Sequence, residues 1–271
     1  MVGALGMGVG VAQSGLLNRV ALMIMSKFPP TFKGMTTALY VAGNVINPLI
    51  PSATAKVSIV APFSKAIGEK LGFKNESEGM GGLFAAMFMS TGVLYPLFLS
   101  ASFFNYTLIG LMPKEVAAKI TWMSWFSATW VWGLVVMVLG YFAIQMLYKP
   151  KEEQKMDPEF INQEISKLGP MTGKEKIVAA ILAVSLCMWI TERVHGISAA
   201  QVAVAALVLM LAFNIFDRVA FRSKIAWDSI FFIGGILNLA ALFPALKVDK
   251  WIGNVVGPVL SPLMSNMYLF N

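Results

Sequence analysis

Long apolar blocks constrain this chain more than any other feature of its sequence. Residues 79–112 and 120–148 contain no charged side chain, and a helix needs only about 20 apolar residues to cross a bilayer. Across the chain 57% of residues are hydrophobic and 13% are charged, whereas soluble domains carry roughly 25% charged residues. One soluble core does not need so many uninterrupted apolar runs. The sequence therefore predicts an all-α integral membrane protein with several spans.

The charged residues lie between the apolar blocks, where they set membrane topology. Because Lys and Arg concentrate in cytoplasmic loops, we attribute the net charge of +7 to topology, and expect the lipid bilayer rather than nucleic acid as partner. The one His and one Cys lie outside any cluster, which argues against a metal site or a disulfide framework. The spans contain almost no acidic residues, so we expect neither an enzyme nor a resident cofactor.

The pattern predicts two membrane parts joined by a linker. Residues 149–176, rich in Lys and acidic residues, are expected to form a cytoplasmic linker. Residues 177–271 are expected to hold three spans and an interfacial helix. Residues 1–148 are expected to contain five elements: the end of a helix, an interfacial helix, a re-entrant hairpin at 33–73, a broken helix at 79–112 and a span at 120–148.

The hairpin is predicted from an interrupted apolar stretch. Pro48 and Pro51 break it just before Ser52, and basic residues flank it on both sides, among them Lys33 and Lys70. One spanning helix would put these flanks on opposite faces, whereas a re-entrant hairpin puts both on the cytoplasmic face. A break at membrane depth is tolerated only where it faces protein or a watery cavity. We therefore expect two half-helices that meet inside the membrane.

A weak internal similarity relates the two membrane parts. GALGMGVGVAQSGLLNRVALMIM and IFFIGGILNLAALFPALKVDKWIGNVV each read as a glycine-bearing helix, a break and an amphipathic stretch. Counting the predicted spans puts the two copies in opposite orientations. Such inverted repeats are typical of secondary transporters.

Several segments resemble the divalent anion/sodium symporter family, which carries di- and tricarboxylates. They are SGLLNRVAL, NPLIPSATAK, APFSKAIGEKLG, FLSASFFNY, MWITERVHGISAAQVAVAALVLML and AWDSIFFIGGILNLAA. The likeness is greatest to the citrate, tartrate and oxoglutarate–malate exchanger branch, whose hairpin tip reads Pro-Ser-x-Thr-Ala-basic. It implies an inverted-repeat fold with two hairpins, of which the second is missing here, so we expect an incomplete chain.

The resemblance also implies a function and a setting. We expect a secondary active transporter of di- or tricarboxylate anions, working by exchange or sodium-coupled symport. It would be a multi-pass homodimer in the cell membrane, either the bacterial inner membrane or an equivalent. Citrate, succinate, malate, tartrate and 2-oxoglutarate all stay open as substrates. The alternatives are a transporter of an inorganic divalent anion such as sulfate, and a non-transporting membrane scaffold subunit.

The resemblance carries over to a small set of residues. Ser52 and Thr54 match the tip, and Ala53 stands where most members have Asn, which removes an amide and weakens a sodium site. Asn105 matches the Asn of an unwound loop facing the tip, and Ser100 stands where that loop often has Thr. The expected substrate ligands are Ser52, Ala53, Thr54, Lys56 and Asn105, and the candidate sodium ligands are Ser52, Ser100 and Asn105.

The residue types suit an anion, although each has a simpler explanation. Unpaired N–H groups and hydroxyls at a helix N-terminus bind anions, yet Ser and Thr also cap helices routinely. Lys56 lies just past the tip, where a charge at membrane depth is costly and functional; alternatively it snorkels to the surface. Asn105 could equally make an interhelical hydrogen bond. A fixed charge at Lys56 favours sodium-independent exchange.

Overall fold

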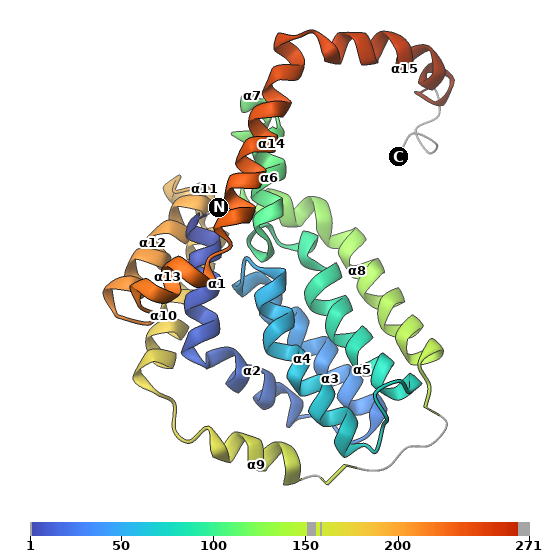
Figure 1. Ribbon diagram of the computed structural model, residues 1–271, viewed down its shortest axis with the longest axis vertical. Helices are drawn as coiled ribbons and strands as arrows, with labels where there is room; N and C mark the ends of the chain where they lie inside the picture. Colours follow the sequence, from blue (N-terminus) through green and yellow to red (C-terminus); the bar gives the residue numbers. More distant parts are fainter. Residues whose placement is uncertain (1, 151–155, 158, 265–271) are drawn as a thin grey trace. The chain divides into compact units, whose positions relative to one another are not determined.

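The computed structural model describes residues 2–150, 156–157 and 159–264, and within them it contains helices and no β-strand (Figure 1). Contacts divide the chain into two units, Met1–Ala226 and Trp227–Asn271. The second unit holds α14 (Trp227–Ala245) and α15 (Val248–Met264), which contact each other.

The first unit contains all the remaining helices of the described residues. Three short elements, η1, η3 and η4, are 3₁₀ turns, and η2 is a π turn. In chain order the elements are α1 (Val2–Ser14), α2 (Leu16–Met25), α3 (Phe32–Ile46), η1 (Asn47–Leu49), α4 (Ala53–Lys70), α5 (Glu78–Phe88), η2 (Met89–Val93), η3 (Tyr95–Leu97), η4 (Leu99–Ala101), α6 (Phe103–Leu111), α7 (Lys114–Ala117), α8 (Trp122–Leu147), α9 (Glu159–Lys167), α10 (Gly173–Ile190), α11 (Glu192–His195), α12 (Ala199–Ala212) and α13 (Arg218–Lys224).

Polar side chains set the starts of the long helices. Thr121 and Ser124 form a reciprocal capping box at the start of α8, and Ser198 and Gln201 form one at α12. Such boxes satisfy N–H groups that a helix start leaves without an intrahelical partner. The helix boundaries inside this apolar chain are thus fixed by a few hydroxyl and amide side chains.

Two helical stretches of the described residues, Glu78–Leu97 and Trp122–Leu147, are long and apolar enough to cross a membrane. A third candidate is the pair α1 and α2, bent by 66°. The bend lies at Gly15, whose φ of 82° is a left-handed conformation that glycine adopts without steric cost. The break between the first two helices is thus where the sequence predicted it, and the interfacial position of α2 stays a prediction.

Helix α8 exposes a long apolar surface. Of its 26 residues only Trp122, Gly133 and Ile144 are buried, and the remainder are almost all apolar. A soluble protein would rarely expose so long an apolar surface. The exposure of α8 therefore supports the all-α membrane fold that the sequence predicts.

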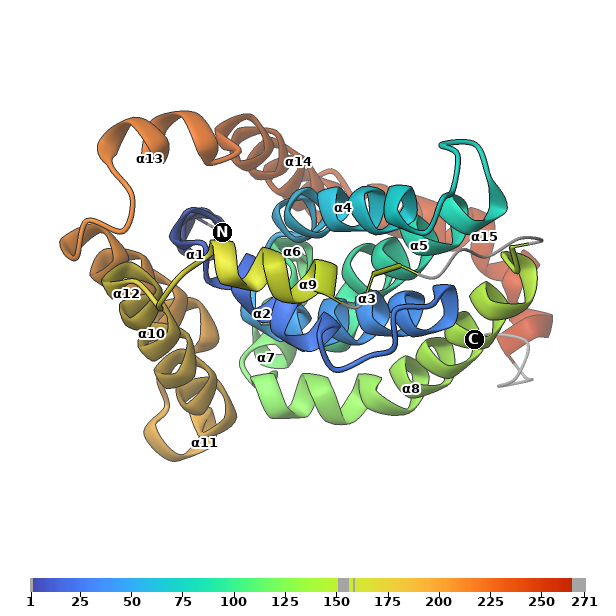
Figure 2. The same ribbon diagram turned by 90° about the horizontal axis from the view of Figure 1, so that it is seen from below.

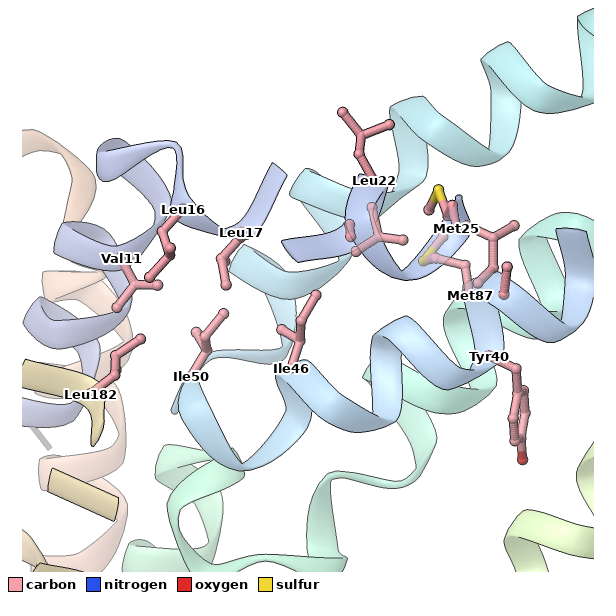
Figure 3. Packing of buried hydrophobic residues seen from close by; sticks show 14 of the residues in the cluster. Val11, Leu16, Leu17, Leu22, Met25, Tyr40, Ile46, Ile50, Met87 and Leu182 are labelled. Carbon is pink, nitrogen blue, oxygen red and sulfur yellow. The ribbon is translucent and has the colours of Figure 1, made fainter. Parts of the chain in front are cut away.

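The buried core joins α1–α5 to α10 and α12. Helix α1 packs on α12, and α3, α4 and α5 pack on one another. Figure 3 shows Leu17 of α2 pointing toward Ile46 and Ile50, at the end of α3 and just beyond η1, while Leu182 of α10 points toward Val11 of α1. The core thus holds the hairpin against helices from both sides of the linker.

The described part of the linker contacts α2. Helix α9 lies alongside α2 (Figure 2), and the Arg19 guanidinium donates to Glu175 Oε1 at 2.8 Å and to the Gly169 carbonyl at 2.9 Å. That hydrogen bond from Arg19 holds the pKa of the Glu175 carboxyl below its ordinary value of 4.5, against the opposing effect of burial. Within its described residues, the linker predicted at 149–176 therefore contains helix α9 and the start of α10.

The contact division does not fall in this linker. It falls after Ala226, because α10 and α12 pack on α1. The repeat boundary at 149–176 and the inverted orientation of the two repeats stay predictions.

Candidate functional site

The first helix break separates α3 from α4. Pro48 and Pro51 have no N–H group, so neither can continue a helical hydrogen-bond ladder. Ile50 is extended, with φ −129°, and the Ser52 hydroxyl oxygen accepts the Ala55 N–H at 3.2 Å to begin α4. Helices α3 and α4 contact each other across the break. The geometry is that of a helix–break–helix unit, and the common membrane face of its ends stays a prediction.

The second break separates α5 from α6. The helix widens into the π turn η2, passes through η3 and η4, and restarts where the Ser102 hydroxyl accepts the Phe104 N–H at 3.2 Å. The Phe103 N–H donates to the Pro51 carbonyl at 3.1 Å, and the Ser100 hydroxyl donates to the Pro48 carbonyl at 2.7 Å. Two backbone carbonyls of the first break are therefore satisfied by the second.

Lys56 is fully buried where the two breaks meet. Its ammonium donates to Asn47 Oδ1 and, at 2.9 Å, to the Ala101 carbonyl. Among the described residues no carboxylate lies within 4.0 Å of Nζ. Snorkelling to the surface is therefore not how this lysine is accommodated. Two N–H groups of the ammonium donate to neutral acceptors, and its third N–H is used by neither of them.

Asn105 is buried in α6 and faces its own break. Its amide group donates to the Phe98 carbonyl at 2.9 Å and to the Tyr95 carbonyl at 3.2 Å. Its oxygen Oδ1 is buried without a hydrogen-bond partner among the described residues. Since both N–H bonds are occupied, Asn105 can offer an acceptor to a ligand and no donor.

The Ser100 hydroxyl likewise has its donor occupied. Its proton goes to the Pro48 carbonyl, and its oxygen accepts the Trp122 indole N–H at 3.0 Å. A hydroxyl has one donor and two lone pairs, so one lone pair is left. Like Asn105, Ser100 can accept from a ligand or coordinate a cation, and cannot donate to a carboxylate in this state.

The tip residues lie at the start of α4. Ser52 uses an oxygen lone pair for capping, which leaves its proton free for a ligand. Ala53 is the first helical residue; the side chain of Thr54 lies outside the described residues. A Cβ added to Gly8 would lie 3.4 Å from Ser52 Cβ, so α1 covers this end of the hairpin.

The set of expected site residues lacked three contributors. Asn47 accepts from Lys56 Nζ while donating to the Ser90 carbonyl at 3.2 Å. Trp122 is buried and donates its indole N–H to Ser100. Glu192 is the third, although its sequence neighbour Arg193 carries the opposite charge.

Glu192 is buried and accepts the Trp122 N–H at 2.9 Å and the Ala199 N–H at 3.3 Å. The starts of α8 and α12 outcompete Arg193 because their N–H groups have no intrahelical partner. The position of Glu192 in the sequence could have indicated this role, because the short helix α11 that begins at Glu192 ends just before Ser198, the N-cap residue of α12.

The two breaks thus present different chemistries. The first offers donors: the Lys56 ammonium, the Ser52 hydroxyl and the N-terminus of α4. The second offers acceptors, namely the remaining lone pair of Ser100 and Oδ1 of Asn105. An anion would bind the first set and a cation the second.

Comparisons with known proteins place the chain in a family. Residues 1–271 match the family described as "Sodium:sulfate symporter transmembrane region", so the chain belongs to this family of multi-pass membrane transporters, which are not enzymes.

Three relatives show the range of the family. The chain is 25% identical to dicarboxylate transporter 1, chloroplastic, of Arabidopsis thaliana, over 91% of this chain and 46% of the relative. It is 25% identical to inner membrane protein YbhI of Escherichia coli, over 89% and 52%, and 24% identical to the L-tartrate/succinate antiporter of that organism, over 97% and 55%. The chain therefore spans about half the length of these relatives.

Proposed function

We propose that the full-length protein containing this chain is a secondary active transporter of small di- and tricarboxylate anions. The observation that carries the proposal is Lys56, a fully buried ammonium between two helix breaks with neutral partners only. An unpaired buried charge is costly, and a substrate carboxylate would relieve that cost. Relatives named for dicarboxylates and for tartrate and succinate support the same chemistry.

The proposed ligands divide by chemistry. Ser52, Lys56 and the start of α4 at Ala53 and Thr54 would hold the carboxylates. Ser100 and Asn105 would supply oxygen atoms to a coupling cation or to a substrate hydroxyl, since their own donors are occupied.

We further propose sodium-independent exchange as the transport mode. Ala53 supplies no side-chain oxygen for sodium, whereas the Lys56 ammonium supplies a positive charge from the chain itself and needs no bound ion. A bare buried charge crosses a low-dielectric barrier poorly. The loaded site should therefore cross more readily than the empty one, which is the property of an exchanger.

A second candidate is sodium-coupled symport. The observation that favours it is that the second break holds two unused acceptors, the orphaned Asn105 Oδ1 and the remaining lone pair of Ser100. Sulfate is a second candidate substrate, because the family description names it.

Counterflow in proteoliposomes tests substrate and mode together. Liposomes holding the full-length protein are loaded with succinate, citrate, sulfate or buffer, and uptake of labelled succinate is followed with and without sodium. We expect uptake that requires an internal carboxylate, ignores sodium and is lost in Lys56→Ala but retained in Lys65→Ala, an exposed lysine of the same helix.

The outcomes separate the candidates. Uptake that needs an inward sodium gradient and ignores internal carboxylate refutes exchange in favour of symport. Uptake driven only by internal sulfate refutes the carboxylate assignment. Full activity of Lys56→Ala refutes the role of the lysine.

We also propose a homodimer in the bacterial inner membrane or an equivalent membrane. The exposed apolar surface of α8 supports contact with lipid or with a second copy, and one relative is named an inner membrane protein. Native mass spectrometry from lipid nanodiscs checks the dimer, since a single-chain mass would contradict it.

A further inference from the structure

A chain of hydrogen bonds links α11 to the first helix break. Glu192 accepts the Trp122 N–H at 2.9 Å, the Trp122 indole N–H donates to Ser100 Oγ at 3.0 Å, and Ser100 Oγ donates to the Pro48 carbonyl at 2.7 Å. Glu192, Trp122 and Ser100 are 8%, 5% and 0% exposed. Buried hydrogen bonds of this kind are costly to leave unmade.

Glu192 holds two helix starts at one point. Trp122 and Ala199 are the first residues of α8 and α12, and both donate their N–H groups to this carboxylate. The positive ends of the two helix dipoles favour the negative charge. The carboxylate therefore fixes where α8 begins relative to α12.

Helix α8 in turn holds the second break. Besides Trp122, the Trp125 indole donates to the Pro96 carbonyl at 2.8 Å and the Thr129 hydroxyl to the Leu97 carbonyl at 2.9 Å. These three side chains are spaced three and four residues apart, so they lie on one face of the helix. The Trp122 ring also stacks on Phe98, with centroids 6.0 Å apart. The position of α8 is thereby transmitted to the unwound segment.

We propose that Glu192 and Trp122 are positioning residues for the substrate site. Through Ser100 they hold the second break against the first, and so keep the Ala101 carbonyl of the second break on the Lys56 ammonium. This inference rests on the proposed transport function. Because neither residue would touch substrate, its loss should raise KM through a misplaced site while leaving the maximal rate of the loaded transporter nearly intact.

Two variants test the proposal in the full-length protein. Trp122→Phe keeps an aromatic ring and removes the indole donor, and Glu192→Gln keeps the shape and removes the charge. We expect KM for the transported carboxylate to rise about tenfold, the effect of one lost buried hydrogen bond, with the maximal rate within about twofold of wild type. Trp130→Phe on the exposed face of α8 and Glu115→Gln on exposed α7 are the matched controls.

A second readout does not depend on substrate. Hydrogen–deuterium exchange of residues 97–105 should accelerate in Trp122→Phe and Glu192→Gln and stay unchanged in both controls. Unchanged exchange in both variants overturns the proposal, as does accelerated exchange with an unaltered KM. If the wild type transports no carboxylate or sulfate, the proposed function fails, while accelerated exchange still supports the link from Glu192 to the break.

A double-mutant cycle separates positioning from general destabilisation. If Glu192 acts through Ser100, then Glu192→Gln should raise KM by a smaller factor in a Ser100→Ala background than in the wild type, because that contact between α8 and the second break is already cut. Additive effects would show that Glu192 acts elsewhere, and would refute the proposal.

Discussion

Replacing Lys56 with methionine should weaken substrate binding without unfolding the protein. Methionine has nearly the length of lysine and no charge, so it can fill the same buried space. The substitution removes the ammonium that bonds Asn47 and Ala101. For folding stability the substitution has two opposing effects, whereas for substrate binding it has only an unfavourable one. This difference makes the variant informative.

For stability, two effects oppose each other. Asn47 Oδ1 and the Ala101 carbonyl lose a donor, at about 1–3 kcal/mol each. Removal of a buried ammonium without a carboxylate partner relieves a desolvation penalty of several kcal/mol. We therefore expect the free energy of unfolding of the substrate-free protein to change by less than about 2 kcal/mol.

For substrate binding, the substitution only removes a favourable interaction. Removing one partner of a buried ion pair costs about 3–5 kcal/mol, which corresponds to at least a roughly hundredfold weaker affinity. Succinate should raise the melting temperature of the wild type, because a ligand that binds only the folded state stabilises it. The same succinate concentration should leave the melting temperature of Lys56→Met unchanged.

The assay is thermal unfolding of the purified full-length protein with and without succinate. Lys65→Met is the control, since Lys65 lies on the same helix with its side chain 59% exposed. A large fall in the melting temperature of substrate-free Lys56→Met would show that the lysine is structural. Wild-type succinate stabilisation in that variant would refute its role in binding.

Three further predictions concern topology, the bend and the linker. Single cysteines at Lys33 and Lys70 should be labelled by an impermeant reagent from the same side; labelling from opposite sides would rule out a re-entrant hairpin. Gly15→Ala should destabilise the protein by about 1 kcal/mol or more, since alanine is strained at positive φ; an unchanged melting temperature would contradict this. The lowered pKa of Glu175 contributes stability that is present above about pH 4.5 and lost as the pH falls through the folded-state value. Arg19→Gln should therefore show a smaller acid-induced drop in melting temperature than the wild type. An equal drop in the two proteins would refute the pairing of Arg19 with Glu175.

The features that the sequence predicted are the local ones. Pro48 and Pro51 cannot donate to a helical ladder, so the break between α3 and α4 follows from two residues alone. The apolar run of 120–148 likewise predicts α8 almost to its ends, because nothing within it competes with the helix. Each of these effects acts over a few residues of chain.

The contacts that could not be predicted are those between distant segments. Lys56 bonds a carbonyl 45 residues away, and the chain carries no local mark of that pairing. The nearest opposite charge to Glu192 in the sequence is its neighbour Arg193. The folded chain instead brings two helix starts to Glu192, one of them 70 residues away. The donor and acceptor roles at the site depend on such long-range bonds.

The charge of Lys56 connects the geometry of the site to its coupling. A charged lysine gives the empty site +1, and a bound dianion changes this to −1. In exchange every crossing is made with substrate bound, so the bare ammonium never has to pass a low-dielectric barrier. Symport requires the empty site to return once per cycle, with a bare +1 unless the lysine releases its proton. A single cation on the acceptors of Ser100 and Asn105 would neutralise the loaded site, yet it would do nothing for the empty one. The step that separates the two modes is therefore the return of the empty site.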